Sequence, residues 1–422
     1  MKIIIKNGRV IDVANKRDEI TNIAIENGKI KHVGDIPSNL VADKTIDATN
    51  RWVLPGLIDS CNRPQMQHPQ GTTLFDEAQA ALKRGITSLC IPPDGDPILD
   101  TSANATRLKQ QSNAKLPAIY PIGALTSHLQ GDAIADLTSL LDAGCIAFSN
   151  AQRPITDSKM LRHCYDYAAS FNLTVIVQPQ CAMLAKGGVA HEGIVATRLG
   201  LPGIPVIAES CAIAQHLLLM QETNVRGHFT CISSFDGVNQ IREAKKSGLN
   251  ISADTAMHQL HLSEMDVVDF NANCHVYPPL RSLRDKEALI EGINDGTIDA
   301  ICSDHRPLDS IAKLAPFGES IPGLSAIDTF LALGLHLVEQ NKCDLHAMIG
   351  AITYRAANLY HLPGGNLSLD ADADICIVDP NHYWTVTESA LYSKGKNSPF
   401  KGWQLPGVIT HTLLKGQLVH ES

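Results

Sequence analysis

The central part of the sequence repeats one unit, in which a short run of β-branched and other apolar residues precedes a stretch with helical spacing. Eight such runs occur: Val53–Ile58, Thr87–Ile91, Ala118–Ile122, Cys145–Phe148, Thr174–Val177, His228–Ile232, Asn250–Ala253 and Ile298–Cys302. The amphipathic stretches include Phe75–Arg84, Asp157–Ala169, Val238–Ser247, Asp285–Ile293 and Ala326–Glu339. Eight units favour an α/β fold of the (β/α)8 TIM-type barrel, which closes at that number. A doubly wound sheet is the alternative, although it does not explain the count.

The two ends of the chain have a different pattern, in which strand-like runs are joined by turns. Asn7-Gly8 and Asn27-Gly28 separate such runs near the N-terminus, and Lys415-Gly416 does so near the C-terminus. Asn-Gly is a strong hairpin signal because both residues tolerate positive φ. We therefore expect one small sheet domain built from residues 1–52 and 366–422, and a barrel domain built from residues 53–365.

Composition excludes several classes of function. A formal net charge of -9 lacks the basic footprint of a nucleic-acid-binding protein. The apolar run Ile3–Ile5 is too short for the core of a signal peptide or for a membrane span. The 11 cysteines include no Cys-x-x-Cys pair, which fits reduced thiols in a cytoplasmic protein. We expect a cytoplasmic chain that binds neither nucleic acid nor a membrane.

Several motifs, spread over the whole chain, carry a specific resemblance. They are Lys6–Asp12, Trp52–Asp59, Leu199–Gly203, Tyr277–Arg281, Asp295–Asp299, Pro316–Gly318, Ile321–Leu324 and Ser393–Gly402. Their residues and their order resemble those of the dihydroorotase family, in the amidohydrolase superfamily. The resemblance implies a (β/α)8 barrel with a small β-sandwich made from both termini, in agreement with the pattern of runs.

The resemblance also implies where a metal would bind. Active members of the family hold zinc through a His-x-His pair after strand one, a carboxylated Lys or an Asp at strand four, single His residues at strands five and six, and an Asp at strand eight. Matching the flanking motifs places at these positions Cys61, Arg63, Asn150 or its neighbour, Gln178, Cys231 and Asp304. Only the last of these keeps the residue that the family uses.

These replacements bear directly on the chemistry. Hydrolysis of a cyclic amide needs a metal that lowers the pKa of a bound water and polarises the carbonyl. Gln178 is a poor ligand, and Arg63 brings a permanent positive charge to the place of the first cation. We therefore predict that the family zinc is absent, that no residue is catalytic, and that Asp304 is a vestige of the metal site.

The positions that would bind substrate differ as well. Where the family has an Arg, two Asn residues and a His, this chain has Gln65, Asp94, Tyr277 and Leu308. An anionic ligand such as dihydroorotate would lose its Arg anchor and would meet an added carboxylate at Asp94.

The positive charge of Arg63 replaces that of the family's zinc at the barrel mouth, so we predict that Arg63 forms an ion pair with Asp304. The alternative, a zinc site made of Cys61, Cys231 and Asp304, is less favoured than buried thiols that fill the volume of lost histidines. The histidines at 228, 258, 261 and 305 lie outside the positions that the family uses for metal, and we interpret them as structural or surface residues.

The resemblance suggests a function without catalysis. In some bacteria an inactive dihydroorotase-like chain assembles with aspartate carbamoyltransferase and supports its architecture. We predict that this chain is such a non-catalytic subunit in pyrimidine biosynthesis, partnered with the carbamoyltransferase catalytic chain, and that it forms a homo-oligomer. Two alternatives remain: an active cyclic amidohydrolase, of dihydroorotase or hydantoinase type, with an unusual metal set, and a pseudoenzyme that binds a small ligand at the barrel mouth.

Overall fold

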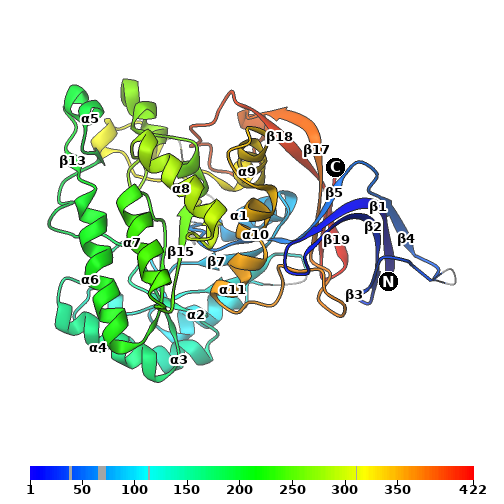
Figure 1. Cartoon of the computed structure of the whole chain (residues 1–422), viewed down its shortest axis with the longest axis horizontal. Coiled ribbons are helices and arrows are strands. Elements are labelled where there is room, and N and C mark those ends of the chain that lie inside the picture. The colour runs from blue at the N-terminus through cyan, green and yellow to red at the C-terminus, as the bar shows by residue number, and fades with distance from the viewer. Residues whose placement is uncertain (38–39, 65–72, 113–114, 310) are drawn as a thin grey trace.

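The computed structural model describes residues 1–37, 40–64, 73–112, 115–309 and 311–422. A barrel surrounded by helices makes up most of it, and a sheet made from both chain ends lies against one side (Figure 1). Among the described residues, no helix is both long and apolar enough to cross a membrane.

Eight parallel strand positions form the barrel. One sheet contains β6 (Leu57–Asp59), β7 (Ile86–Ile91) and β8 (Ala118–Pro121). The second contains β9 (Gly123–Ala124), β10 (Phe148–Ser149), β11 (Thr174–Val177), β14 (Arg226–Phe229), β15 (Ile251–Ala256) and β16 (Ala300–Cys302). β9 continues β8 after a one-residue break, and a parallel bridge between Asn62 and His305 joins the first strand to the last. Each of the eight predicted runs overlaps one barrel strand, which confirms the barrel.

The first predicted run is in fact two strands. Trp52–Pro55 forms β5, which belongs to the terminal sheet, and only Leu57–Asp59 enters the barrel as β6. Gly56 lies between the two strands. Its position requires glycine, because a Cβ there would lie 2.2 Å from Thr87 Oγ1. Pro55-Gly56 interrupts the apolar run at this point, and the terminal sheet extends to residue 55, past the boundary expected after residue 52.

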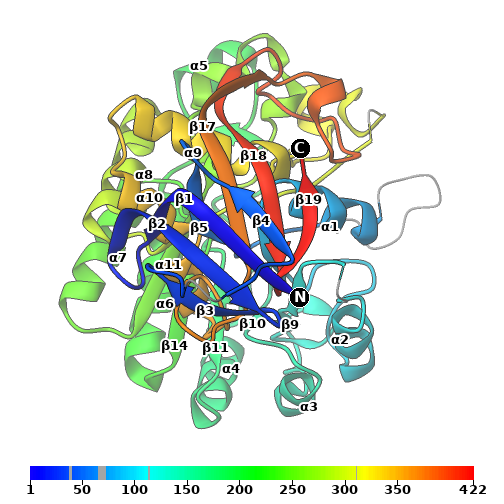
Figure 2. The same ribbon diagram turned by 90° about the vertical axis from the view of Figure 1, so that its right-hand side faces the viewer.

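The sheet of the two termini has the strand order β19-β18-β17-β5-β1-β2-β3, and β4 pairs with β1 (Figure 2). Its other strands are β1 (Lys2–Asp12), β2 (Arg17–Glu26), β3 (Lys29–Val33), β4 (Lys44–Asp47), β17 (Ile375–Thr385), β18 (Gln404–Leu414) and β19 (Gln417–Glu421). Both ends contribute to one buried cluster that includes Ile3, Ile23, Ile375 and Leu413. The sheet thus packs as a sandwich around a core separate from that of the barrel.

Two of the three predicted hairpin turns are present, at Asn27-Gly28 between β2 and β3 and at Lys415-Gly416 between β18 and β19. The turn predicted at Asn7-Gly8 is wrong, because β1 runs through it with a bulge between Ile5 and Gly8. Gly8 packs against β5, and a Cβ there would lie 2.5 Å from Val53 Cγ2. Close approach to a neighbouring strand, rather than a turn, accounts for this glycine.

Helices cover the outside of the barrel. They are α1 (Leu74–Lys83), α2 (Ser102–Lys109), α3 (Leu137–Asp142), α4 (Ser158–Ser170), α5 (Ile194–Leu199), α6 (Ile207–Thr223), α7 (Phe235–Lys246), α8 (Leu283–Asp295), α9 (Phe330–Glu339), α10 (Leu345–Ala351) and α11 (Tyr354–Leu359). The five helical stretches predicted from the sequence overlap α1, α4, α7, α8 and α9. Leu359 and Tyr360, at the end of α11, pack with barrel residues such as Ile58, Cys90 and Ala300, so this helix closes the amino-terminal end of the barrel.

Candidate functional site at the barrel mouth

The carboxyl ends of the barrel strands bring together most of the residues that the resemblance assigns to metal positions. Cys61 and Arg63 follow β6, Gln178 follows β11, Cys231 follows β14, and Asp304 follows β16. Cys231 and Asp304 have φ values of 55° and 46°, a left-handed conformation that residues other than glycine rarely adopt. Such backbone conformations gather at functional sites, where the surrounding structure imposes them.

Arg63 lies at the centre of this group. Its Nε donates to Asp304 Oδ1 at 2.8 Å, and Nη1 lies 2.5 Å from Asp94 Oδ2. Nη2 donates to Gln178 Oε1 at 3.3 Å. The side chains of Arg63 and Asp304 are each 8% exposed, so the pair is almost fully removed from water. The ion pair predicted between these two residues is therefore present, and Asp94, which the resemblance assigns to a substrate position, is a second partner.

Burial and charge act in opposite directions on these groups. Burial opposes the charge of Arg63, but the carboxylates of Asp94 and Asp304 raise its pKa well above the usual value. Burial raises the pKa of Asp304 to about 7, while the Arg63 guanidinium favours the ionised carboxylate. A carboxylate this deeply buried depends on its cation, because an isolated charge in such a place is strongly disfavoured.

Three thiols lie beneath the arginine. Cys61, Cys231 and Cys302 form one buried cluster with Ala256. The sulfurs of Cys231 and Cys302 are 3.8 Å apart, and Cys61 Sγ is 3.8 Å from Asp304 Oδ1. The sequence reasoning missed Cys302, the last residue of β16, which lies two residues before Asp304. Burial raises the pKa of the Cys302 thiol, which keeps it protonated at neutral pH.

These residues do not fit a hydrolytic zinc. The ligand atoms of Cys61, Cys231 and Asp304 lie within 4.8 Å of one another, but Asp304 Oδ1 already accepts from Arg63. A second group, made of Cys231, Asp254 and Cys302, has the same spacing. Its carboxylate is also engaged, because Asp254 accepts from the Cys231 backbone N–H at 2.7 Å. Neither group offers an imidazole, and a cation at the first would stand beside a permanent guanidinium.

A buried polar pair below the thiols was also missed. His228 Nε2 lies 3.0 Å from Asp254 Oδ2, and its Nδ1 lies 2.8 Å from Ser252 Oγ, with histidine and aspartate fully buried. His305 lies outside the mouth, where its Nε2 is 3.0 Å from Glu77 Oε2. Both histidines are structural, as the sequence indicated, and hydrogen bonds satisfy their ring nitrogens.

The other sites inferred from the resemblance lie outside this cluster. Asn150 accepts from Thr126 Oγ1 at 2.6 Å and donates to Arg153 O, so its amide joins the loops that follow β9 and β10. Tyr277 packs against an apolar cluster, while its carbonyl accepts from Gln178 Nε2 at 3.4 Å. Leu308 is buried, and its backbone N–H donates to the side chain of Asn397. Gln65 lies outside the described residues.

Side chains fill the interior directly below Arg63. The cavity there has a volume of about 10 Å³, and its lining includes Cys61, Ser149, Ala151 and Thr230. Such a volume holds about one water molecule. Ser149 and Ala151, rather than Asn150 between them, face this space at the fourth strand.

A buried histidine nearby leads to a prediction about pH. Neither ring nitrogen of His258 has a hydrogen-bond partner among the described residues, and burial lowers its pKa from 6.5 to about 3. In the unfolded chain the same group takes up a proton below pH 6.5, so its contribution to stability is lost as the pH falls from 6.5 towards 3. Replacement His258→Phe should therefore reduce the loss of unfolding free energy between pH 6.5 and 5 by about 2 kcal/mol. Urea titrations at several pH values measure this difference.

The exposed His163 provides the control, since His163→Phe should leave the pH dependence of stability as it is in the parent protein. Equal pH dependence in the parent and His258→Phe would contradict the prediction.

Comparison with known proteins agrees with this fold. Residues 52–419 match the model of the amidohydrolase family. A dihydroorotase-like protein of Pseudomonas aeruginosa is 40% identical over 426 residues, which cover all of both chains. A dihydroorotase of Syntrophus aciditrophicus is 35% identical, again over the full length of both. The solved structure of an L-hydantoinase from Arthrobacter aurescens superposes with a TM-score of 0.87 at 23% identity, covering 99% of this chain and 96% of that one, and shows the shared fold. The chain therefore belongs to the amidohydrolase family, and within it to the dihydroorotases and dihydroorotase-like proteins.

Proposed function

We propose that this chain has lost the hydrolytic activity common in its family and acts as a non-catalytic assembly subunit for the catalytic chain of aspartate carbamoyltransferase in pyrimidine biosynthesis. The observation that carries the proposal is the position of Arg63, whose guanidinium binds Asp304, at a metal position, and Asp94, at a substrate position. One side chain thus binds the carboxylates that stand at an inferred metal position and at an inferred substrate position.

The loss of activity follows from the chemistry that remains. The family is typically metal-dependent, and a metal-bound water is the nucleophile that ring opening requires. Here the groups around the mouth are a guanidinium, buried thiols and an amide, none of which replaces such a nucleophile. The buried Asp304 is held by Arg63 at 2.8 Å and is therefore a poor general base.

The assembly role rests on family relationship together with a retained fold. The chain keeps the barrel, the terminal sandwich and full-length similarity to a protein described as dihydroorotase-like, while the chemistry of the mouth is replaced. A chain with this combination keeps its surfaces available for protein contacts. We also propose that it forms a homo-oligomer.

Metal content and ring opening test the loss of activity. After expression in zinc-supplemented medium, the purified chain should contain far less than one zinc per polypeptide and should open neither dihydroorotate nor hydantoin. A catalytic dihydroorotase purified in parallel serves as the positive control. Stoichiometric zinc together with measurable ring opening would instead establish the active amidohydrolase.

Co-expression with the aspartate carbamoyltransferase of the same organism tests the assembly role. We expect one complex on size-exclusion chromatography and carbamoyltransferase activity that depends on this chain. Asp304→Asn is the informative variant, because Arg63 keeps Asp94 as a partner in it while the last family metal ligand is removed. It should support the carbamoyltransferase as well as the parent chain does. Loss of support in a folded Asp304→Asn variant, or separate elution of the two proteins, would count against the proposal.

A further inference from the structure

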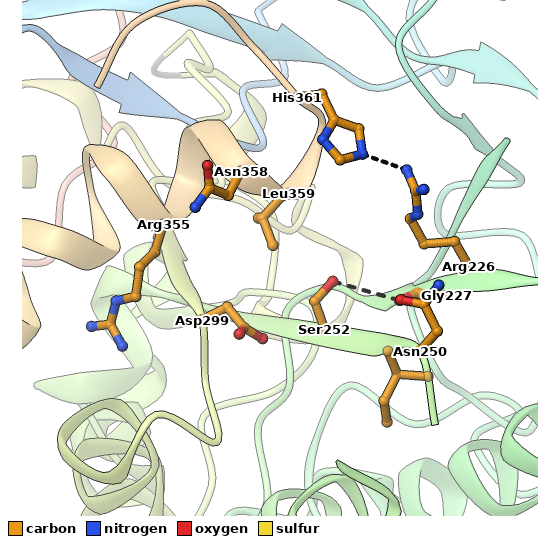
Figure 3. A pocket seen from close by; sticks show the side chains of 10 residues that line it. Arg226, Gly227, Asn250, Ser252, Asp299, Arg355, Asn358, Leu359 and His361 are labelled. Carbon is orange, nitrogen blue, oxygen red and sulfur yellow. Dashed lines mark hydrogen bonds between the residues drawn. The ribbon is translucent and has the colours of Figure 1, made fainter. Parts of the chain in front are cut away.

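A second cavity lies at the opposite end of the barrel from the mouth. It has a volume of about 350 Å³, and polar side chains of Arg226, Ser252, Asp299, Arg355, Asn358 and His361 lie along it (Figure 3). That volume is within the range of pockets that hold small metabolites. In barrel enzymes this end of the strands serves stability, so the fold itself does not require a polar cavity here.

The walls come from the starts of three strands and from the helix that closes the barrel. Arg226 is the first residue of β14, Ser252 lies at the start of β15, and Asp299 directly precedes β16. Arg355 and Asn358 belong to α11, and the chain then turns at His361, whose φ is 53°. Figure 3 shows Arg226 and His361 together on one side, and Arg355 and Asp299 on the other.

Arg226 has no carboxylate partner within 4.0 Å among the described residues. Its Nη1 donates to His361 Nε2 at 2.5 Å, and its Nη2 donates to Asn172 Oδ1 at 3.2 Å. Since a guanidinium can only donate, His361 accepts through Nε2, which leaves its Nδ1–H as a donor. This end of the cavity therefore presents a full positive charge and an additional hydrogen-bond donor.

A second guanidinium lines the same cavity. Arg355 donates to Ala347 O, and burial lowers its pKa. Within the described part of the chain it has no ion pair. The carboxylate of Asp299 is already bound by Lys245 at 2.5 Å and by the backbone N–H of Ala253 at 2.8 Å. The cavity thus carries an excess of positive charge in a chain whose formal net charge is -9.

We infer that this cavity binds a small metabolite that carries a phosphate or carboxylate group. The anionic group lies against Arg226 and the Nδ1–H of His361, because both offer donors and neither meets a carboxylate. Arg355 adds attraction from the other side, and Ser252 and Asn358 provide polar contacts for the remainder of the ligand. The site is separate from the barrel mouth and does not depend on the proposed loss of metal.

Calorimetric titration of the full chain with pyrophosphate and, separately, with citrate tests the inference. We expect saturable binding of at least one of them, with thermal stabilisation that exceeds the effect of sodium chloride at equal ionic strength. Tighter binding of pyrophosphate identifies a phosphorylated ligand, and tighter binding of citrate identifies a carboxylated one. Absence of saturable binding by both probes would overturn the inference.

Variants locate the binding. Arg226→Gln should weaken binding of the preferred probe by about tenfold or more, equivalent to about 1.4 kcal/mol. Arg226→Lys keeps the charge but loses the planar guanidinium, so its affinity for the probe should lie between those of the parent chain and Arg226→Gln. Arg198→Gln makes the same change of charge on the exposed face of α5 and should bind as the parent chain does. If folded Arg226→Gln and Arg226→Lys both bind like the parent chain, the anion does not occupy this cavity.

Discussion

Replacement of Arg63 by glutamine should lower the free energy of unfolding by about 3–5 kcal/mol. Arg63 and Asp304 are each 8% exposed, and the same guanidinium also binds Asp94. Glutamine removes the cation but leaves the carboxylates in place, so the buried carboxylate of Asp304 loses the guanidinium that binds it at 2.8 Å. Equilibrium unfolding in urea, at pH 7.5 and without metal, measures the change.

Two further variants separate this effect from a general effect of losing an arginine. Arg17 pairs with Glu19 at 3.3 Å on the surface, where the side chains are 31% and 57% exposed. Arg17→Gln should lower the free energy of unfolding by about 0–1 kcal/mol. Asp304→Asn, added to Arg63→Gln, should recover much of the lost stability, because the unpaired charge is then absent. A cost below about 1 kcal/mol for Arg63→Gln would show that the pair contributes little and that the mouth is open to water.

The barrel could be predicted from the sequence because its signal is repeated and local. Each strand alternates with an amphipathic stretch, and the count of eight selects one architecture. What the pattern could not give depends on contacts between distant residues. A Cβ at Gly56 would meet Thr87, and a Cβ at Gly8 would meet Val53, so residues distant in the sequence account for both glycines. Neither neighbour is visible from the local sequence.

The site shows the same division between local and distant information. The pairing of Arg63 with Asp304 follows from charge balance at two known positions, and the structure has it. Asp94 was identified only as an unfavourable neighbour for an anionic substrate, whereas its carboxylate binds the guanidinium. The resemblance assigned Asn150 or its neighbour to a degenerate metal position, and the structure has the amide of Asn150 bound to Thr126.

The cavity at the base of the barrel had no signal in the sequence. Arg226 and His361 are 135 positions apart, and each is unremarkable by itself. Their combination arises because β14 and the segment after α11 meet at one end of the barrel. The residues of the barrel mouth could be predicted from the sequence only because the family resemblance indicates where metal and substrate would bind.

Introduction of histidine at the four positions where the resemblance implies a histidine ligand should create a zinc site. In the variant C61H/R63H/Q178H/C231H, four imidazoles join Asp304, which the loss of Arg63 frees as a ligand. Zinc favours such nitrogen and carboxylate donors. We expect about one zinc per chain, bound at least about 100-fold more tightly than by the parent protein. The expectation is one ion rather than two, because Asn150, near the place of the family's bridging group, binds Thr126. Competition with a chromophoric chelator measures the affinity.

The decisive comparison is the variant that keeps the arginine, C61H/Q178H/C231H. It has three of the four imidazoles, but the guanidinium still occupies Asp304 Oδ1 at 2.8 Å and repels a cation at the same place. If Arg63 is the main obstacle to a metal, this variant should bind zinc only weakly, and the single further change R63H should produce most of the gain. Equally tight binding by both variants would mean that the missing imidazoles alone account for the loss, and that the role assigned to Arg63 is wrong.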